Sequence, residues 1–122
     1  DNCIQDHKKA FKWYSLAAER GEASAQRSLG VMYALGQGVT QDYTKAAKWF
    51  DMAAKQGDKH AQYNLGVMYY RGNGVPKDLL MAHQLFSLAA AQGDKEARSY
   101  KNKVAEILMK DRMKKDYSLV QD

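Results

Sequence analysis

Residues 42–77 read DYTKAAKWFDMAAKQGDKHAQYNLGVMYYRGNGVPK, and the 36 residues before them, 6–41, read DHKKAFKWYSLAAERGEASAQRSLGVMYALGQGVTQ. Aligned without a gap, the two segments are identical at 18 of 36 positions. A third copy begins at Asp78, keeps a shorter set of the shared residues and diverges after Ala97. Self-similarity at a fixed period of this length is typical of proteins built from stacked repeats.

Each copy has the pattern of two short helices joined by a tight turn. In the first helix the apolar positions follow the spacing of an amphipathic helix, and they are Ala10, Trp13, Tyr14, Ala17 and Ala18 in the first copy. A short carboxylate begins this helix in every copy and is a predicted N-cap; these residues are Asp6, Asp42 and Asp78. Glycine ends it, because glycine accepts the left-handed backbone of a helix terminus; these residues are Gly21, Gly57 and Gly93.

The second helix of each copy begins with an acidic residue at its positive end, and these residues are Glu22, Asp58 and Asp94. Gly30 and Gly66 lie in its interior, where glycine costs about 1 kcal/mol relative to alanine. The repetition of this cost predicts that a neighbouring backbone approaches too closely for a side chain. Turns rich in glycine then lead to the next copy, and Val39 and Val75 are predicted to point inward.

The predicted fold is all-α, a solenoid of three helix-turn-helix repeats in one domain spanning residues 1–122. The repeats are 6–41, 42–77 and 78–116, the last including a C-terminal capping helix. The cap has one apolar stripe, formed by Ala97, Tyr100, Val104, Ile107 and Leu108. At the other end, Cys3 to Asp6 aligns with Val39 to Asp42, which predicts that the chain opens inside a repeat loop. We therefore expect a fragment or mature part of a longer chain, whose first hairpin is covered by further repeats, a partner or a second copy.

Composition limits the classes of function. The charge of +5 and the pI near 9.3 permit an acidic partner without requiring one. Cys3 is the only cysteine, so the fold must depend on its apolar core. No apolar segment is as long as a membrane span, and the chain starts at Asp1 without a signal peptide.

The sequence resembles the Sel-1-like repeat family, relatives of the tetratricopeptide repeats. The resemblance lies in A-x-x-W-[YF]-x-x-A-A-x-x-G, then A-x-x-x-L-G-x-M-Y, then G-x-G-V-x-x-D, over Asp6 to about Gly93. In the third copy Lys101 and Asn102 replace the family's Leu-Gly. The resemblance implies a right-handed superhelix with a concave face lined by the first helices. It also implies an adaptor for protein complexes, often bacterial and often exported to the periplasm or secreted, with a cytoplasmic location as the alternative.

The candidate binding surface is the face of the first helix that lies opposite its apolar stripe. Its residues differ between copies, which is expected both of a binding surface and of unconstrained exposed residues. Extended faces are how solenoids bind their partners. The residues assigned to this surface are Lys8, Phe11, Lys12, Ser15, Glu19, Thr44, Lys48, Asp51, Lys55, Leu80, Gln84 and Ser87. Its lysines favour acidic protein or peptide ligands.

Other candidate sites have simpler interpretations. The helical spacing of Trp13, Trp49, Tyr33 and Tyr69 favours core residues over a ligand box. Phe11 is either a binding anchor or a buried residue. His7, His60 and His83 fall at unrelated repeat positions, and the sequence has no metal-ligand spacing, so no metal or cofactor is expected. The paired glycines of the loops are interpreted as turns rather than a phosphate site.

Three functions remain open. The repeat pattern favours a protein-interaction scaffold without catalytic residues, and the uncapped first repeat also permits self-association. The second possibility is a hydrolase acting on β-lactams or peptidoglycan, suggested by the resemblance. The sequence lacks the S-x-x-K, S-D-N and K-T-G motifs that serine acylation of this kind uses. The third is polyanion binding by the basic segment 101–116, whose mixed charges are more typical of a solvated helix; nucleic acid is the least favoured partner.

Overall fold

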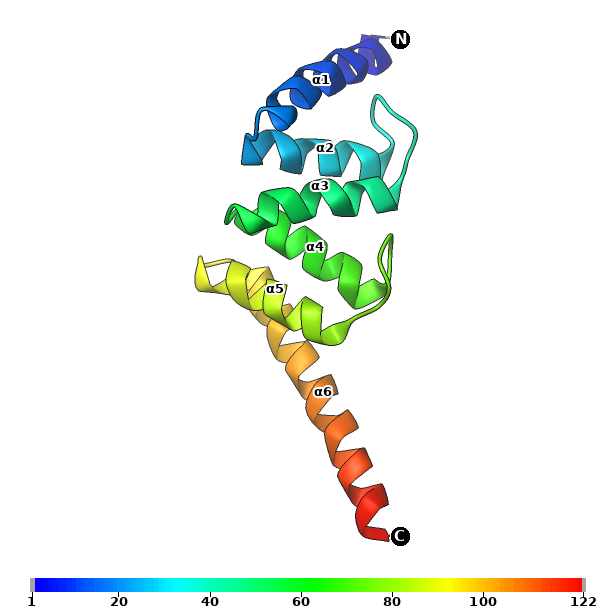
Figure 1. Cartoon of the computed structure of the whole chain (residues 1–122), viewed down its shortest axis with the longest axis vertical. Coiled ribbons are helices and arrows are strands. Elements are labelled where there is room, and N and C mark those ends of the chain that lie inside the picture. Colours follow the sequence, from blue (N-terminus) through cyan, green and yellow to red (C-terminus); the bar gives the residue numbers. More distant parts are fainter. Residues whose placement is uncertain (1, 122) are drawn as a thin grey trace.

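The computed structural model describes residues 2–121 and forms a row of helices stacked side by side (Figure 1). The helices are α1 (Asn2–Glu19), α2 (Ala23–Leu35), α3 (Tyr43–Lys55), α4 (Lys59–Arg71), α5 (Leu79–Ala91) and α6 (Lys95–Gln121). Tight turns join α1 to α2, α3 to α4 and α5 to α6 at one edge of the row, and longer loops return at the other edge (Figure 1). The predicted all-α solenoid of three helical pairs is confirmed.

The predicted helix ends are confirmed at most positions. Asp42 and Asp78 accept hydrogen bonds from the backbone N–H groups of Lys45 and Met81, each at 3.0 Å. Asp58 and Asp94 begin α4 and α6 in the same way, at 2.9 Å. Gly21, Gly57 and Gly93 close the turns between paired helices with φ of 97°, 94° and 94°. These turns therefore depend on local sequence, as the pattern indicated.

Two predictions about the start of the chain are wrong. Asp6 is not an N-cap, because α1 already begins at Asn2 and Asp6 lies inside it. The segment aligned with a repeat loop is therefore helical in this structure. Glu22, at the start of α2, makes no side-chain capping bond, whereas the shorter Asp58 at the equivalent position does.

The interior glycines of α2 and α4 do lie at close approaches, but the neighbour is a ring rather than a backbone. A Cβ atom at Gly30 would lie 2.6 Å from Cδ1 of Phe50 on α3. A Cβ atom at Gly66 would lie 2.8 Å from Cε1 of Phe86 on α5. The next helix along the row therefore packs a phenyl ring against each glycine. The sequence predicted contact with a neighbouring backbone, and this prediction is wrong. The aromatic residue of the repeated motif points across to the preceding helix, so its ring is the neighbour of the glycine.

Each return loop packs against the first helix of its own repeat, which is α1 for the first loop and α3 for the second. Gly74, with φ of 73°, lies so close to the carbonyl group of Tyr43 that a Cβ atom would collide with it. Gly38 makes the equivalent approach to His7. Val39 and Val75 are half-buried, which confirms that they point inward.

The core runs along the row as three neighbouring clusters rich in alanine. Small side chains allow the helices to approach closely, and Ala46, Ala53, Ala82 and Ala89 have no exposed surface. The third pair adds an aromatic group in which the Phe86 ring stacks on Tyr100 of α6 at a centroid distance of 5.1 Å. Ala97 and Val104 are also fully buried, so the predicted apolar stripe of the cap is confirmed. The helix continues past the predicted limit of residue 116 and projects beyond the stack (Figure 1).

Burial of the aromatic residues differs between the first repeat and the others. Trp49, Tyr33 and Tyr69 are half-buried and pack against the core, as predicted. Trp13, predicted as core, is 74% exposed, and Tyr14 beside it is 40% exposed. The prediction for Trp13 is wrong because no described residue packs over this face of α1.

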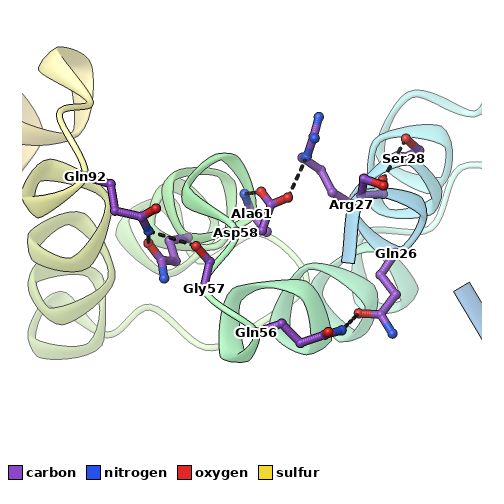
Figure 2. Close-up of polar contacts among 10 residues, drawn as sticks. Gln26, Arg27, Ser28, Gln56, Gly57, Asp58, Ala61 and Gln92 are labelled. Atoms are coloured by element: carbon purple, nitrogen blue, oxygen red, sulfur yellow. Dashed lines mark hydrogen bonds and ion pairs between the residues drawn. The ribbon is translucent and has the colours of Figure 1, made fainter. Parts of the chain in front are cut away.

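A glutamine side chain links each pair of helices to the pair before it (Figure 2). Gln92 donates through Nε2 to the carbonyl oxygen of Gly57 at 2.8 Å and to Oε1 of Gln62 at 3.0 Å. Gln56 makes the same two bonds one repeat earlier, to Gly21 and Gln26. Gln62 is only 3% exposed, so its oxygen depends on the Gln92 donor. The repeated hydrogen bonds fix the register between successive repeats.

Replacing Gln92 with alanine should lower the free energy of unfolding by about 1–2 kcal/mol, because two acceptors lose their donor and one of them is buried. Urea denaturation followed by circular dichroism measures the loss. Gln84→Ala is the matched control, since Gln84 is an exposed glutamine on α5, the helix that ends just before Gln92, and should change stability by less than about 0.5 kcal/mol. Equal effects of the two changes would contradict a role of Gln92 in the register.

Candidate functional site

The surface predicted from the sequence lies on α1, α3 and α5, and part of it is occupied by contacts within the helices. The hydroxyl groups of Ser15 and Ser87 donate to carbonyl oxygens of their own helices, each at 2.7 Å. Lys55 pairs with Asp51 at 2.9 Å, a contact that raises the pKa of the lysine through its hydrogen bond and charge interaction with the carboxylate. Such exposed pairs contribute little to stability.

Phe11 packs against the core while keeping part of its side chain exposed. Its side chain is half-buried, and its ring meets the Tyr33 ring edge-on at a centroid distance of 5.6 Å. The contact agrees with the interpretation as a packed residue, and the role of Phe11 in binding stays a prediction. Lys8, Lys12 and Lys48 are exposed. None of the twelve predicted residues lines any of the hollows described below.

The hollows of the surface lie mainly along α2 and α4. One, of about 380 Å³, is bounded by Val31 and Leu35 of α2, Phe50 of α3 and Asn64 and Arg71 of α4. The next, of about 490 Å³, extends from α2 across α4 to the start of α6. Val31, Tyr63 and Asn64 line both hollows, so the two are adjacent. We call the two together the α2–α4 groove.

Tyr63 and Asn64 lie at the centre of the α2–α4 groove. Burial, together with the carboxylate of Glu96, raises the pKa of Tyr63 to about 12, so its phenol keeps its proton at neutral pH. The Tyr63 ring also packs against Phe86 and Tyr100, which holds it in place. The amide of Asn64 supplies both a donor and an acceptor, the combination that pairs with a peptide group.

Charged residues of both signs border the groove. Arg27 on α2 donates through Nε to Oδ2 of Asp58 at 3.1 Å, and this bond crosses from one repeat to the next (Figure 2). Lys95 and Glu96 lie at the far end of the groove on α6. The groove therefore combines aromatic, amide and charged groups on a rigid helical support and has no single dominant sign of charge.

Metal and membrane sites do not emerge from the described residues. Within residues 2–121, no three side chains of the kinds that bind metals gather closely enough to hold an ion. His7, His60 and His83 are carried by three different helices, α1, α4 and α5. No helix in the same range is long and apolar enough to cross a membrane.

The repeated pattern matches the family model described as Sel1 repeat at residues 1–22, 23–58 and 59–94, which is 94 of the 122 residues. The chain belongs to the Sel1 repeat family. The family unit begins at the helix that carries the Leu-Gly pair, so 23–58 contains α2 and α3, and 59–94 contains α4 and α5. The period is the one found by self-alignment, offset by about half a unit.

Solved structures of bacterial Sel1-type proteins are similar to this chain over about three-quarters of its length. A protective antigen with an SLR fold, present in uropathogenic Escherichia coli strains, has 42% identity and a TM-score of 0.73 over 74% of this chain. A Sel1 repeat protein from Oxalobacter formigenes has 42% identity and a TM-score of 0.73 over 75%. Cysteine rich protein B of Helicobacter pylori has 31% identity and a TM-score of 0.70 over 73%.

The similarity covers different shares of these proteins. This Sel1 chain matches only 19% of the Escherichia coli antigen, but 69% of the Oxalobacter protein and 67% of the Helicobacter protein. No curated protein matches the chain significantly. The comparisons thus identify the fold and family, and the binding surface has to be inferred from the structure itself.

Sequence reasoning missed the α2–α4 groove and the glutamine links. Gln26 and Gln62 repeat at one register, as do Gln56 and Gln92, and this repetition was the available signal for a buried polar link. The groove gave a weaker signal, because its central residues are not repeated between copies. Tyr63 and Asn64 stand where the first copy has Arg27 and Ser28. Variable positions on the second helix were therefore as informative as those on the first.

Proposed function

We propose that this Sel1 repeat chain is a protein-interaction scaffold that binds a segment of a partner protein in the α2–α4 groove. Proteins of this family generally serve as scaffolds for protein interactions. The observation that supports the groove is the adjacency of two hollows lined by residues of successive repeats, with Tyr63 and Asn64 between them. Extended surfaces that cross several repeats are the usual binding sites of solenoids.

The groove suits an extended or helical peptide better than a small molecule. It is open along one side and is lined by Val31, Tyr63 and Asn64 rather than closed around a cavity. An amide can bond to a peptide group, and a tyrosine ring offers contact area at a low cost in side-chain entropy. The mixture of Arg27, Lys95 and Glu96 among its lining residues favours a partner segment that carries both charges.

The surface predicted from the sequence remains the alternative location for the same function. Lys12, Lys48 and Lys55 project from α1 and α3, and they would favour an acidic partner. The two surfaces use different helices, so separate substitutions can distinguish them.

Asn64→Arg should weaken partner binding at least about tenfold, which corresponds to 1.4 kcal/mol. Asn64 lines both hollows, so a long charged side chain there would obstruct a bound segment. Lys12→Glu combined with Lys48→Glu and Lys55→Glu should leave binding through the groove unchanged. Proteins captured by the immobilised chain and by both variants would be quantified by mass spectrometry, and the strongest partner would then be purified for affinity measurement.

Circular dichroism and thermal melting serve as controls. The three lysines are exposed, so each of their changes should alter stability by less than about 0.5 kcal/mol. Asn64 is half-buried, so the binding of Asn64→Arg is compared at a temperature at which its melting curve shows it folded. Binding lost in the triple variant and kept in Asn64→Arg would assign the function to the α1–α3 surface. Binding kept in both variants would contradict both locations.

A further inference from the structure

Helix α5 has an apolar outer face although this face lies on the surface. Its 13 residues, LLMAHQLFSLAAA, include no Asp, Glu, Lys or Arg. Leu80, Met81 and Leu88 point away from the core and are 66%, 37% and 52% exposed. A helix that is apolar on all sides is normally covered on all sides. Within residues 2–121, nothing covers the outer face of α5.

The equivalent positions of α3 are basic rather than apolar. The lysines at these positions, all exposed, are Lys45, Lys48 and Lys55. Lys55 pairs with Asp51, and Lys45 lies over the ring of Tyr33 at 5.7 Å from its centroid. Lys48 makes no ion pair with a described residue. It is therefore available to a carboxylate of a bound molecule.

The outer faces of α3 and α5 adjoin at the ends of the two helices. Gln92, directly after α5, donates to the carbonyl oxygen of Gly57, two residues after α3, at 2.8 Å (Figure 2). Leu85 of α5 also packs in the same core cluster as Ala54 of α3. The last turns of the two helices therefore lie side by side. We call their shared outer surface the α3–α5 face, and its residues are Lys48, Met52, Leu80, Met81 and Leu88.

One position of this face stays apolar in every repeat. Leu16, Met52 and Leu88 are equivalent residues of α1, α3 and α5, and all three are exposed. Single exposed apolar residues are common, but those that adjoin on neighbouring helices form a patch of the kind that marks an interaction site. Met52 and Leu88 thus extend the apolar surface of α5 toward the lysines of α3.

We infer that the α3–α5 face binds a segment of another protein in which a block of apolar residues adjoins a block of acidic residues. The apolar block packs on Leu80, Met81 and Leu88, and the acidic block lies over Lys48. The sequence predicted acidic ligands for the whole surface of the first helices, whereas the structure divides it into a basic and an apolar part. The α3–α5 face shares no residue with the α2–α4 groove and does not depend on binding there.

The charges of the chain disfavour a second copy as the occupant. The exposed apolar residues Met109 and Met113 of α6 are each followed by a lysine, Lys110 and Lys114. Docking of this helix on the α3–α5 face would bring its lysines toward Lys48, and like charges repel. An acidic segment has the opposite sign and removes this repulsion.

Three types of synthetic peptide with a fluorescent label test the inference by fluorescence anisotropy. The first type has a block of leucines joined to a block of glutamates, made in both orders. The second has the same residues interspersed, and the third has lysines in place of the glutamates. The block peptide in one of its orders should bind at least about tenfold more tightly than the other two types. Its affinity should fall as salt is added, because salt screens the contact with Lys48.

Substitutions on the chain locate the bound peptide. Leu88→Gln should weaken binding of the block peptide at least about tenfold, because it places a polar group in the apolar contact. Lys48→Gln should weaken binding and reduce its dependence on salt. Met113→Gln is the matched control, since Met113 is an exposed apolar residue of α6, and it should keep the affinity of the unchanged chain. Circular dichroism shows whether each variant is folded.

Equal affinities for the block and interspersed peptides, or equal affinities of the unchanged chain and Leu88→Gln, would overturn the inference. Loss of binding in Asn64→Arg but not in Leu88→Gln would place the peptide in the α2–α4 groove instead. Vesicles of phosphatidylcholine and phosphatidylglycerol, and sedimentation velocity of the chain alone, test two other occupants. Vesicle binding or a dimer that is lost in Leu88→Gln, without binding of the block peptide, would assign the face to lipid or to a second copy.

Discussion

Replacement of Phe86 with alanine is expected to lower the free energy of unfolding by about 3–5 kcal/mol, the range for a fully buried aromatic residue. Phe86 has no exposed surface, and its ring contacts both Tyr63 and Tyr100. Removing it would leave a cavity beside Gly66 on α4, which has no side chain to fill it. Urea denaturation followed by circular dichroism would give the difference.

Tyr14→Ala is the matched control for Phe86→Ala, because both residues occupy one position of the repeat. Tyr14 is 40% exposed, so its loss should cost less than about 1 kcal/mol. The difference between the two losses in unfolding free energy measures how much a covering helix contributes to stability at this position of the repeat. Equal losses would mean that the face of α1 is as well packed as that of α5, which would contradict the difference in burial between the two residues.

The second large effect is expected from Gly66→Leu, which should destabilise the chain by about 1–3 kcal/mol through overpacking. A Cβ atom alone would come within 2.8 Å of the Phe86 ring, and the rest of a leucine side chain has no space to occupy. The loss should exceed the gain of about 1 kcal/mol that replacing a helical glycine normally gives. Thermal and urea denaturation would both report it.

Asn102→Leu is the control at the same register, since Asn102 is exposed on α6 and should tolerate leucine within about 0.5 kcal/mol. Combining Gly66→Leu with Phe86→Ala gives a sharper test, because the leucine would then occupy space that the ring has left. The two changes should therefore be far from additive, as expected for residues in contact. A gain in stability from Gly66→Leu alone would show that the ring does not restrict the glycine.

The repeat and its helices were predictable because their signals are local and occur more than once. Asp42 and Asp78 cap their helices, and Gly57 and Gly93 end them, whatever packs around them. Asp6 was mispredicted by the same rule, since α1 extends to Asn2 and passes beyond the expected cap. A local signal thus loses its meaning where its structural context changes.

The candidate site was harder to predict, because a binding surface depends on how the faces of several helices combine. The self-alignment found variable residues on both helices of the unit but did not indicate which face is hollowed. Tyr63 and Asn64 of α4 line the groove together with residues of α2 and α6, which lie far from them in sequence. Their place in the groove could be recognised only from the arrangement of these helices in the structure.

The sequence by itself determined the period of 36 residues, because the same residues recur at that spacing. It also determined the two helices in each unit and the glycines between them, because helix caps and turns depend on residues close together in the chain. The tertiary structure alone decided which copy of a repeated residue is buried. Phe86 is fully covered while its equivalent Tyr14 is 40% exposed. The physical reason is that burial is a property of the neighbouring helix, and a glycine-bearing helix lies against Phe86 but not, within residues 2–121, against Tyr14.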